Sequence, residues 1–183
     1  MSESNQWVID ASHSNAGFTV KHMMITNVRG EFTKLEGKVD WDPAKPEATR
    51  IEAVIDVASI STREEKRDGH LKSADFFDVE QFPKISFKSK SVKAKGSDEL
   101  AVTGDLSIHG VTKEVVLDVE GPSAFMKSQR GVLTGATATT KISRKEFGVL
   151  WNNMIEMMPV VGDEVTVTID LELTRPALPG ATQ

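Results

Sequence analysis

Hydrophobic and polar residues alternate with a period of two along most of the chain. Between Val165 and Leu173 every odd-numbered position is apolar, and Thr, Asp and Glu occupy the positions between them. Such alternation predicts a strand with one buried and one exposed face, which is typical of antiparallel sheets. The pattern predicts strands over residues 16–22, 35–41, 50–57, 85–93, 100–108, 115–119 and 165–173.

Turn-forming residues separate the predicted strands. Gly, Pro, Asn and Asp are concentrated at residues 27–30, 42–46, 96–98, 109–110, 121–122 and 162–163. About eight strands with short connections predict a closed barrel or a sandwich. Several of these strands would be roughly 26–40 Å long at about 3.3 Å per residue, so the barrel would be tall.

The segment from Ser61 to Gly69 departs from the alternation and predicts a helix. Thr62 suits the N-cap, Glu65 would complete a capping box, and Gly69 suits the end of the helix. A second short turn is expected over residues 73–79. Because this connection is too long for a hairpin, we expect a helical insertion over about residues 62–79 that covers or plugs one end of the barrel.

One domain accounts for the whole pattern. A chain of 183 residues is typical of a single domain that folds without disulfides. We expect an N-terminal extension over residues 1–6, a barrel over residues 7–175 and a tail over residues 176–183. There is no apolar run of about 18 residues and no signal-peptide pattern. We therefore expect no stable membrane insertion and a cytoplasmic location, or a periplasmic one if a signal peptide was removed.

Composition narrows the class of ligand. The chain has 22 Lys and Arg against 27 Asp and Glu, a net charge of −5, which argues against binding to nucleic acid or to an anionic surface. It has no cysteine, which excludes thiolate metal sites and a cysteine nucleophile. There is no tyrosine beside 8 Phe, 3 Trp and 7 Met. Buried faces with so few hydroxyls favour a long hydrocarbon over a sugar or a nucleotide.

Recognisable catalytic patterns are absent from the sequence. The four histidines, at positions 13, 22, 70 and 109, lack the spacing of a metal site. The sequence also lacks a phosphate-binding loop and a nucleophile elbow. We therefore predict no metal, no cofactor and no enzymatic activity.

The parity of the strand faces selects candidates for the barrel lining. We predict that the lumen is lined by Phe18, Val20, His22, Phe32, Phe87 and Leu106. His22 is either a core histidine bonded to a neighbour or a cavity group that meets the head of a ligand. Arg63, His70 and Arg144 are further candidates for head-group contacts, with a solvated or salt-bridged position or a capping role as the alternative.

Methionines gather in two places, at residues 23–24 and within residues 152–159. Thioether side chains adapt to irregular apolar shapes. They either fill gaps in the core or line a site for a flexible apolar ligand. The 152–159 segment is a second irregular stretch that could gate a cavity.

Several segments in a fixed order resemble one known family. The most specific is Asp68-Gly69-His70-Leu71-Lys72-Ser73-Ala74-Asp75-Phe76-Phe77-Asp78. The others lie at residues 10–14, 18–22, 28–32, 59–62, 82–89, 104–113, 142–148 and 161–165. Together they resemble the YceI-like family of lipid- and polyisoprenoid-binding proteins from Trp7 to Leu173. The 152–159 segment departs from the glycine-rich pattern that is usual there.

The resemblance implies an all-β, lipocalin-like antiparallel barrel of about eight long strands with a short helical insertion. It implies a soluble, non-enzymatic carrier whose apolar lumen holds a polyisoprenoid or another long-chain amphiphile, and it makes a homodimer an option. Two alternatives stay open. One is an enzyme that acts on an isoprenoid or quinone in the same cavity, with His22 and His70 as acid–base candidates. The other is an interaction module whose barrel is filled by its own side chains.

Overall fold

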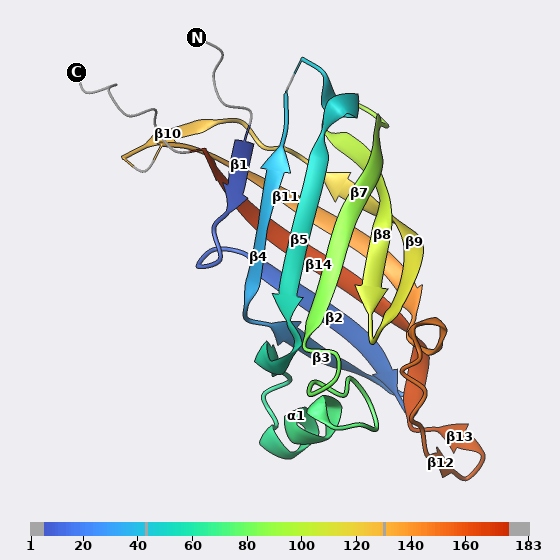
Figure 1. The fold of residues 1–183 in the computed structure, drawn as a ribbon. Coiled ribbons are helices and arrows are strands. Elements are labelled where there is room, and N and C mark those ends of the chain that lie inside the picture. The colour runs from blue at the N-terminus through green and yellow to red at the C-terminus, as the bar shows by residue number, and fades with distance from the viewer. Residues whose placement is uncertain (1–5, 43, 130, 176–183) are drawn as a thin grey trace.

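The chain folds into a tall antiparallel β-barrel with one α-helix beneath its lower end (Figure 1). The computed structural model describes residues 6–42, 44–129 and 131–175. The strands and the helix are β1 (Gln6–Ile9), β2 (Asn15–His22), β3 (Thr26–Phe32), β4 (Leu35–Asp40), β5 (Arg50–Asp56), β6 (Ile60–Ser61), α1 (Glu65–Lys72), β7 (Lys84–Ala94), β8 (Glu99–Ile108), β9 (Val111–Glu120), β10 (Met126–Ser128), β11 (Gly131–Ser143), β12 (Met154–Ile155), β13 (Met158–Pro159) and β14 (Val161–Arg175). Short 3-10 helices are η1 (Pro46–Ala48), η2 (Val57–Ser59) and η3 (Lys145–Phe147).

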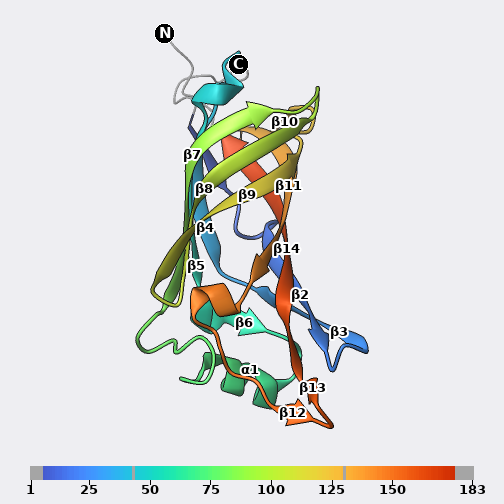
Figure 2. The ribbon, with the colours of Figure 1, turned by 90° about the vertical axis from the view of Figure 1, so that its right-hand side faces the viewer.

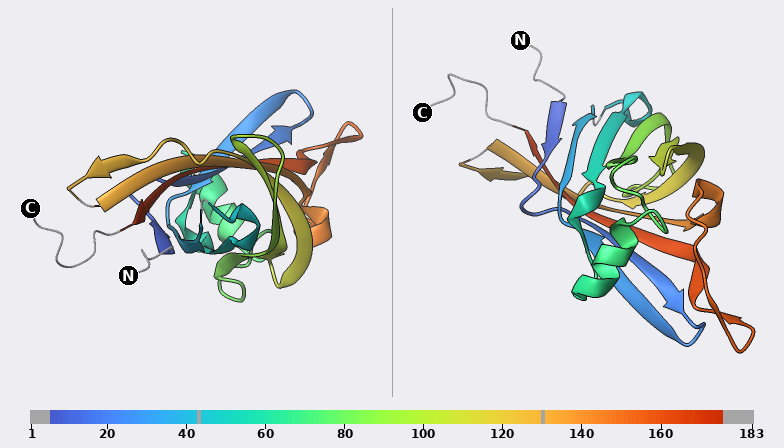
Figure 3. Two further views of the ribbon diagram at one scale, coloured as in Figure 1. Left: turned by 90° about the horizontal axis from the view of Figure 1, so that it is seen from above. Right: turned by 60° about the horizontal axis from the view of Figure 1, so that its bottom comes forward.

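Eight of the described strands close into a ring, in the order β1, β4, β5, β7, β8, β9, β11 and β14. The ring closes at β14, which pairs with β11 on one edge and with β1 on the other. The view from above in Figure 3 shows these strands surrounding a central axis. The predicted antiparallel barrel with a helical insertion is therefore confirmed.

At two positions in the barrel wall, a break divides the strand into two consecutive elements, β1 and β2 at one position and β3 and β4 at the other. Both β1 and β2 pair with the same edge of β14, β1 at residues 173–174 and β2 at residues 161–170. The break between them is a turn in which the Asp10 carboxylate accepts a hydrogen bond from the Ser12 N–H at 2.9 Å. The next strand is divided in the same way, since β3 pairs with β2 and β4 pairs with β1. The barrel wall therefore extends beyond the ring toward α1.

Most predicted strands are found close to their predicted bounds, but the turns at residues 27–30 and 162–163 were wrong. Residues 27–30 lie within β3, and residues 162–163 lie near the start of β14. In both places the structure explains the glycine by a close contact with the neighbouring strand. Gly30 leaves space for the ring of Phe18 on the neighbouring strand, and Gly162 lies against the backbone of Lys21.

The parity of β7 changes part way along the strand. Its pairing with β8 shifts register between Ser89 and Ser91, so that Val92 rather than Ser91 is buried. Ser89 is buried at this irregularity, and its hydroxyl accepts a hydrogen bond from the Ile51 N–H at 2.8 Å. A bulge adds one residue and reverses the face of the positions that follow. Simple alternation through residues 85–93 was therefore wrong beyond Ser89.

The N-cap of the helix lies two residues later than predicted, and the helix ends three residues later. Arg63 has a φ of 62°, a left-handed conformation that cannot be part of an α-helix. Glu64 is the N-cap instead, and its carboxylate accepts hydrogen bonds from the N–H groups of Lys66 and Arg67. Gly69 lies inside α1, which continues to Lys72.

Thr62, the predicted N-cap, has a different task. It is buried, and both its N–H and its hydroxyl donate to the Asp68 carboxylate, at 2.8 and 2.5 Å. This side chain therefore attaches the helix to the barrel.

Two predicted segments include residues for which no structure is described. The extension was predicted over residues 1–6, and Gln6 belongs to β1. Residues 1–5 and the tail over residues 176–183 lie outside the described residues. None of the described helices has the length and apolar character needed to cross a bilayer.

Candidate functional site

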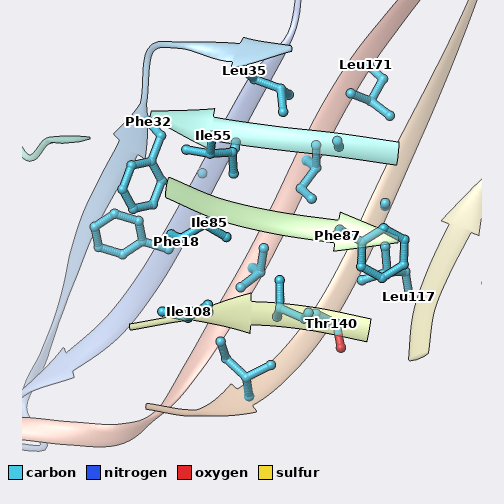
Figure 4. A pocket seen from close by; sticks show the side chains of 18 of the residues that line it. Phe18, Phe32, Leu35, Ile55, Ile85, Phe87, Ile108, Leu117, Thr140 and Leu171 are labelled. Atoms are coloured by element: carbon cyan, nitrogen blue, oxygen red, sulfur yellow. The ribbon is translucent and has the colours of Figure 1, made fainter. Parts of the chain in front are cut away.

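A cavity of about 260 Å³ occupies the interior of the barrel (Figure 4). Its walls are the inward-facing side chains of the ring strands and of β2, together with side chains from α1 and the segment that follows it. They are Val, Ile, Leu, Ala and Phe almost throughout. Such a surface suits a hydrocarbon and gives a sugar or a nucleotide no hydrogen-bond partner.

Few polar side chains lie among the lining residues, and none of their polar atoms is offered to the lumen. The Thr140 hydroxyl donates to the Val116 carbonyl at 2.9 Å. The Thr49 hydroxyl is covered by its neighbours and has no hydrogen-bond partner among the described residues. The Arg144 guanidinium donates to backbone carbonyls. Polar recognition of a ligand is therefore not built into the wall of the cavity.

Two of the lining phenylalanines lie flat against the barrel wall because glycine stands opposite them. A Cβ atom at Gly30 would lie 2.4 Å from the Cζ atom of the Phe18 ring. A Cβ atom at Gly104 would lie 2.5 Å from Cζ of the Phe87 ring. Only glycine has room for an aromatic ring laid across it from the next strand. Each ring therefore covers the backbone and leaves the centre of the lumen open.

Small side chains on β11 widen the lumen on the opposite side. Ala136, Ala138 and Thr140 alternate along the inward face of this strand and line the cavity. Bulky residues at these positions would fill a barrel of eight strands, as they do where such barrels have packed interiors. The lumen is therefore left open by residue size on β11 and by ring orientation on β2 and β7.

The helical insertion closes the lower end of the cavity. Figure 2 shows α1 beneath this end of the barrel. Leu71 on α1 and the following residues Phe76 and Phe77 line the cavity. The Phe77 ring meets the Phe32 ring edge to face, with centroids 5.8 Å apart. The insertion is therefore part of the cavity wall.

Aromatic residues gather at the opposite end of the barrel. The Trp7 ring lies 5.7 Å from Trp41 and 5.5 Å from Phe125, measured between centroids. Trp41 and Pro122 line the cavity. Trp7 is almost fully buried, although its indole N–H has no hydrogen-bond partner within the part of the chain that the structure describes. This end is therefore closed by packed rings and by the loop that follows Gly121.

Five of the six residues predicted for the lumen line the cavity: Phe18, Val20, Phe32, Phe87 and Leu106. His22 does not. It is exposed at the end of β2, where it pairs with Thr26 and Val161. Parity places it on the same strand face as Val20, but its side chain is exposed, whereas its partner Val161 lines the cavity. Its prediction as a lumen residue was wrong.

The three candidates for head-group contacts lie in different surroundings. Arg63 is exposed in the loop before α1 and does not line the cavity. His70 is half-buried outside the cavity, with its Nε2 atom 2.7 Å from the Asp75 carboxylate. Its ring packs edge to face against Phe76 and Trp151 at 5.0 and 4.8 Å. His70 thus joins α1 to the segment around Trp151.

Arg144 is buried and organises the loop between β11 and β14. Its Nε atom donates to the Gly162 carbonyl at 2.8 Å, and its Nη1 atom donates to the Val149 and Trp151 carbonyls at 2.7 and 2.8 Å. The Nη2 atom donates to the Val161 carbonyl at 3.2 Å. The alternative of a solvated or salt-bridged position was wrong, because the guanidinium holds both ends of the loop. Arg144 is among the lining residues, and its contact with a ligand head group stays a prediction.

Charge around this loop follows from burial and from hydrogen bonding. Burial lowers the pKa of Arg144, an effect that Asp163 opposes. Burial alone would raise the pKa of Asp163, but hydrogen bonds from the Ser143 hydroxyl and the Lys145 N–H lower it overall. Ser143 donates to both carboxylate oxygens, at 2.9 and 2.8 Å. The loop is therefore fixed at both ends by charged groups.

One group of potential metal ligands is brought together from distant parts of the sequence, so sequence spacing does not indicate it. Asp10, His13 and Glu172 lie close together on the barrel wall, away from the cavity. Their positions follow from the turn between β1 and β2, in which His13 Nδ1 lies 3.1 Å from the Asp10 carboxylate. The Ser14 hydroxyl accepts a hydrogen bond from the Glu172 N–H of β14 at 3.0 Å. We assign this group a structural role, because these bonds account for its arrangement.

Comparison with known proteins gives a consistent result. A family model described as YceI-like domain matches residues 7–173. A UPF0312 protein of Vibrio cholerae is 34% identical over 145 residues, which cover 78% of this chain and 77% of that protein. The structure of Burkholderia cenocepacia BcnA superposes with a TM-score of 0.76 at 26% identity, covering 90% of this chain and 98% of that one.

A third likeness concerns the fold alone. A polyisoprenoid binding domain from Saccharophagus degradans, implicated in plant cell wall breakdown, superposes with a TM-score of 0.69 at 18% identity. The match covers 93% of this chain and 98% of that domain. At this identity it supports the same barrel and does not transfer a ligand.

Proposed function

Because the chain belongs to the YceI-like family, we propose that it is a carrier that holds a polyisoprenoid or another long-chain amphiphile in its barrel. The lipid's hydrocarbon chain lies in the cavity, and its head group lies outside the apolar wall. The protein binds this lipid without catalysing a reaction on it.

The apolar cavity is the single observation that carries the proposal. Its volume of about 260 Å³ lies inside a wall that offers a ligand almost no polar atom. Each methylene group moved from water into such a space contributes about 0.8 kcal/mol. A long chain therefore gains affinity from its length alone, whereas a polar molecule would lose its hydrogen bonds to water.

The alternatives find less support in the structure. An enzyme acting inside the cavity would need an acid or base there, and neither His22 nor His70 lines it. An interaction module with a packed barrel would lack this cavity, whereas Gly30, Gly104 and Ala138 keep the lumen open. The carrier interpretation uses the cavity as it stands.

Extraction of the purified protein tests the proposal. Protein prepared without detergent is extracted with organic solvent, and the extract is analysed by mass spectrometry. We expect a long-chain lipid in a stoichiometric amount with the protein. A blank extract, together with no uptake of a polyprenyl alcohol by the delipidated protein, would contradict the proposal.

The space beside Gly30 makes a prediction about ligand size. A Cβ atom in Gly30→Ala would lie 2.4 Å from the Phe18 ring and 2.8 Å from the Thr62 side chain. The ring has to turn into the lumen, so we expect the variant to load less lipid and to favour shorter chains. Mass spectrometry of the extracts measures both. Gly96→Ala is the matched control, since nothing lies within 4 Å of that position; equal loading of wild type and Gly30→Ala would contradict the role of the ring.

A further inference from the structure

At two hairpin tips, methionine has a positive φ, a backbone conformation that favours Gly and Asn. At the turn between β2 and β3, Met23 and Met24 have φ values of 47° and 57°, and the Ile25 N–H donates to the His22 carbonyl at 3.0 Å. At the turn between β12 and β13, Glu156 and Met157 have φ values of 48° and 67°. Positive φ at both central residues defines a type I′ turn, for which Asn-Gly is strongly preferred. Both tips therefore keep side chains that weaken the local backbone.

These side chains point into solvent. Met157 is 91% exposed and Ile25 is 71% exposed, although apolar side chains of this size usually pack against a neighbour. The apolar residues of the two tips are Met24, Ile25, Met154, Ile155, Met157 and Met158. We refer to these six residues as the tip patch. Neither local stability nor packing accounts for them.

The two tips lie side by side, at the end of the barrel that carries α1 (Figure 1; Figure 3, right). The Met23 N–H donates to the Val160 carbonyl at 2.9 Å, and His22 pairs with Val161. The hairpins are therefore joined at their bases and project in the same direction, which brings their exposed apolar residues to one end of the molecule.

The tip patch continues from the wall of the cavity. Val149 and Val161 line the cavity, and they begin and end the loop that carries the β12–β13 hairpin. Leu150, the residue after Val149, is exposed. The arm from Met158 to Val161 is apolar throughout and connects the tip patch to the lumen, whereas Asn152 and Asn153 interrupt the other arm. An occupant of the patch would stand next to the end of the lumen.

Local charge at the tips differs from that of the whole chain. The chain has a net charge of −5, yet between Gly17 and Gly30 the only formally charged residues are Lys21 and Arg29, both exposed. In the second tip, Glu156 is the only charged residue between Gly148 and Gly162. Basic residues beside exposed apolar ones match the charge order of a phospholipid surface, where phosphates lie above acyl chains.

We infer that the tip patch docks the protein onto the surface of a phospholipid bilayer, with Met and Ile side chains inserted among the acyl chains. The flexible thioethers suit a fluid phase without fixed shape. Docking brings the α1 end of the barrel to the membrane. The inference goes beyond the proposed function and rests on it only for its purpose, which is exchange of the carried lipid with the bilayer.

Flotation with vesicles tests the inference. The full chain is mixed with phosphatidylcholine vesicles, and with vesicles of phosphatidylethanolamine and phosphatidylglycerol, and the bound fraction is measured. The first variant replaces Met23-Met24 by Asn-Gly and Glu156-Met157 by Asn-Gly. We expect it to lose vesicle affinity by about tenfold or more, because it removes Met24 and Met157 from the contact. The same variant should unfold at a higher temperature, because both turns receive their preferred residues.

Met126→Ser is the matched control. Met126 is 66% exposed and lies on β10, at the opposite end of the barrel (Figure 1). We expect its vesicle binding to equal that of the wild type. An Asn-Gly variant that binds vesicles as the wild type does would overturn the inference. So would a wild type that leaves both kinds of vesicle unbound, or one whose tips instead join two copies, seen as a dimer that the variant loses in sedimentation.

The failure of docking and the failure of the proposed function give different results. A protein that takes up a polyprenyl alcohol from detergent micelles but does not float with vesicles keeps its carrier function and loses the docking inference. A protein that floats with vesicles but contains no lipid after separation from them keeps the docking inference and loses the carrier function.

Discussion

Replacing Arg144 by alanine is expected to lower the free energy of unfolding by roughly 3–5 kcal/mol. The guanidinium donates hydrogen bonds to four backbone carbonyls, including those of Val149 and Gly162. Alanine leaves several of these carbonyls buried with no donor, and each buried, unsatisfied group costs about 1–3 kcal/mol. The expected loss is therefore a large part of the stability of a domain of this size.

Urea unfolding followed by circular dichroism measures this loss. We expect the midpoint to fall while the slope of the transition stays the same, because the surface exposed on unfolding does not change. Arg50→Ala is the matched control: Arg50 donates to the Ala48 and Thr49 carbonyls but is exposed. It should lose less than about 1 kcal/mol. A loss of the same size in both variants would show that burial of Arg144 has no special effect.

The second large effect concerns lipid loading. Replacing both Phe18 and Phe87 by aspartate places two carboxylates in the lumen, where no charged partner other than Arg144 lies among the lining residues. Moving an unpaired carboxylate out of water costs several kcal/mol, and each 1.4 kcal/mol is about a tenfold change in affinity. We therefore expect lipid loading to fall by about a hundredfold or more.

Loading is measured by extraction and mass spectrometry, and folding is checked by circular dichroism. Val116→Asp is the control on the outer face of β9, where Val116 is 48% exposed; it should load lipid as the wild type does. Phe18→Leu with Phe87→Leu keeps the lumen apolar and should also load. A folded double aspartate variant with unchanged loading would place the lipid outside the cavity.

The alternation of side chains was enough to predict the architecture and most inward faces. On β14, Val165, Val167 and Ile169 were predicted on the buried face, and all three line the cavity. Alternation fails where the contrast between the two faces is weak. Residues 134–140 of β11 read Thr-Gly-Ala-Thr-Ala-Thr-Thr, and no strand was predicted there, although this small-residue strand widens the lumen.

The wrong predictions have a common physical origin, which is that local patterns do not show where an element meets its neighbours. The parity of His22 matches that of Val20, but only the fold shows that the His22 side chain is exposed and does not line the cavity. The sequence around Thr62 is typical of a helix cap, but in the structure its hydroxyl donates a hydrogen bond to the Asp68 carboxylate. The partners of Arg144 are carbonyls from two separate stretches of chain, so no spacing near residue 144 could indicate them.

The pairing of β14 sets the order of events during translation. This strand, Val161–Arg175, seals the ring by joining β11 to β1 and β2, which lie near the start of the described residues. Until β14 has been synthesised and has paired, one edge each of β1, β2 and β11 stays unpaired. The ring therefore cannot enclose its interior until this last strand is in place.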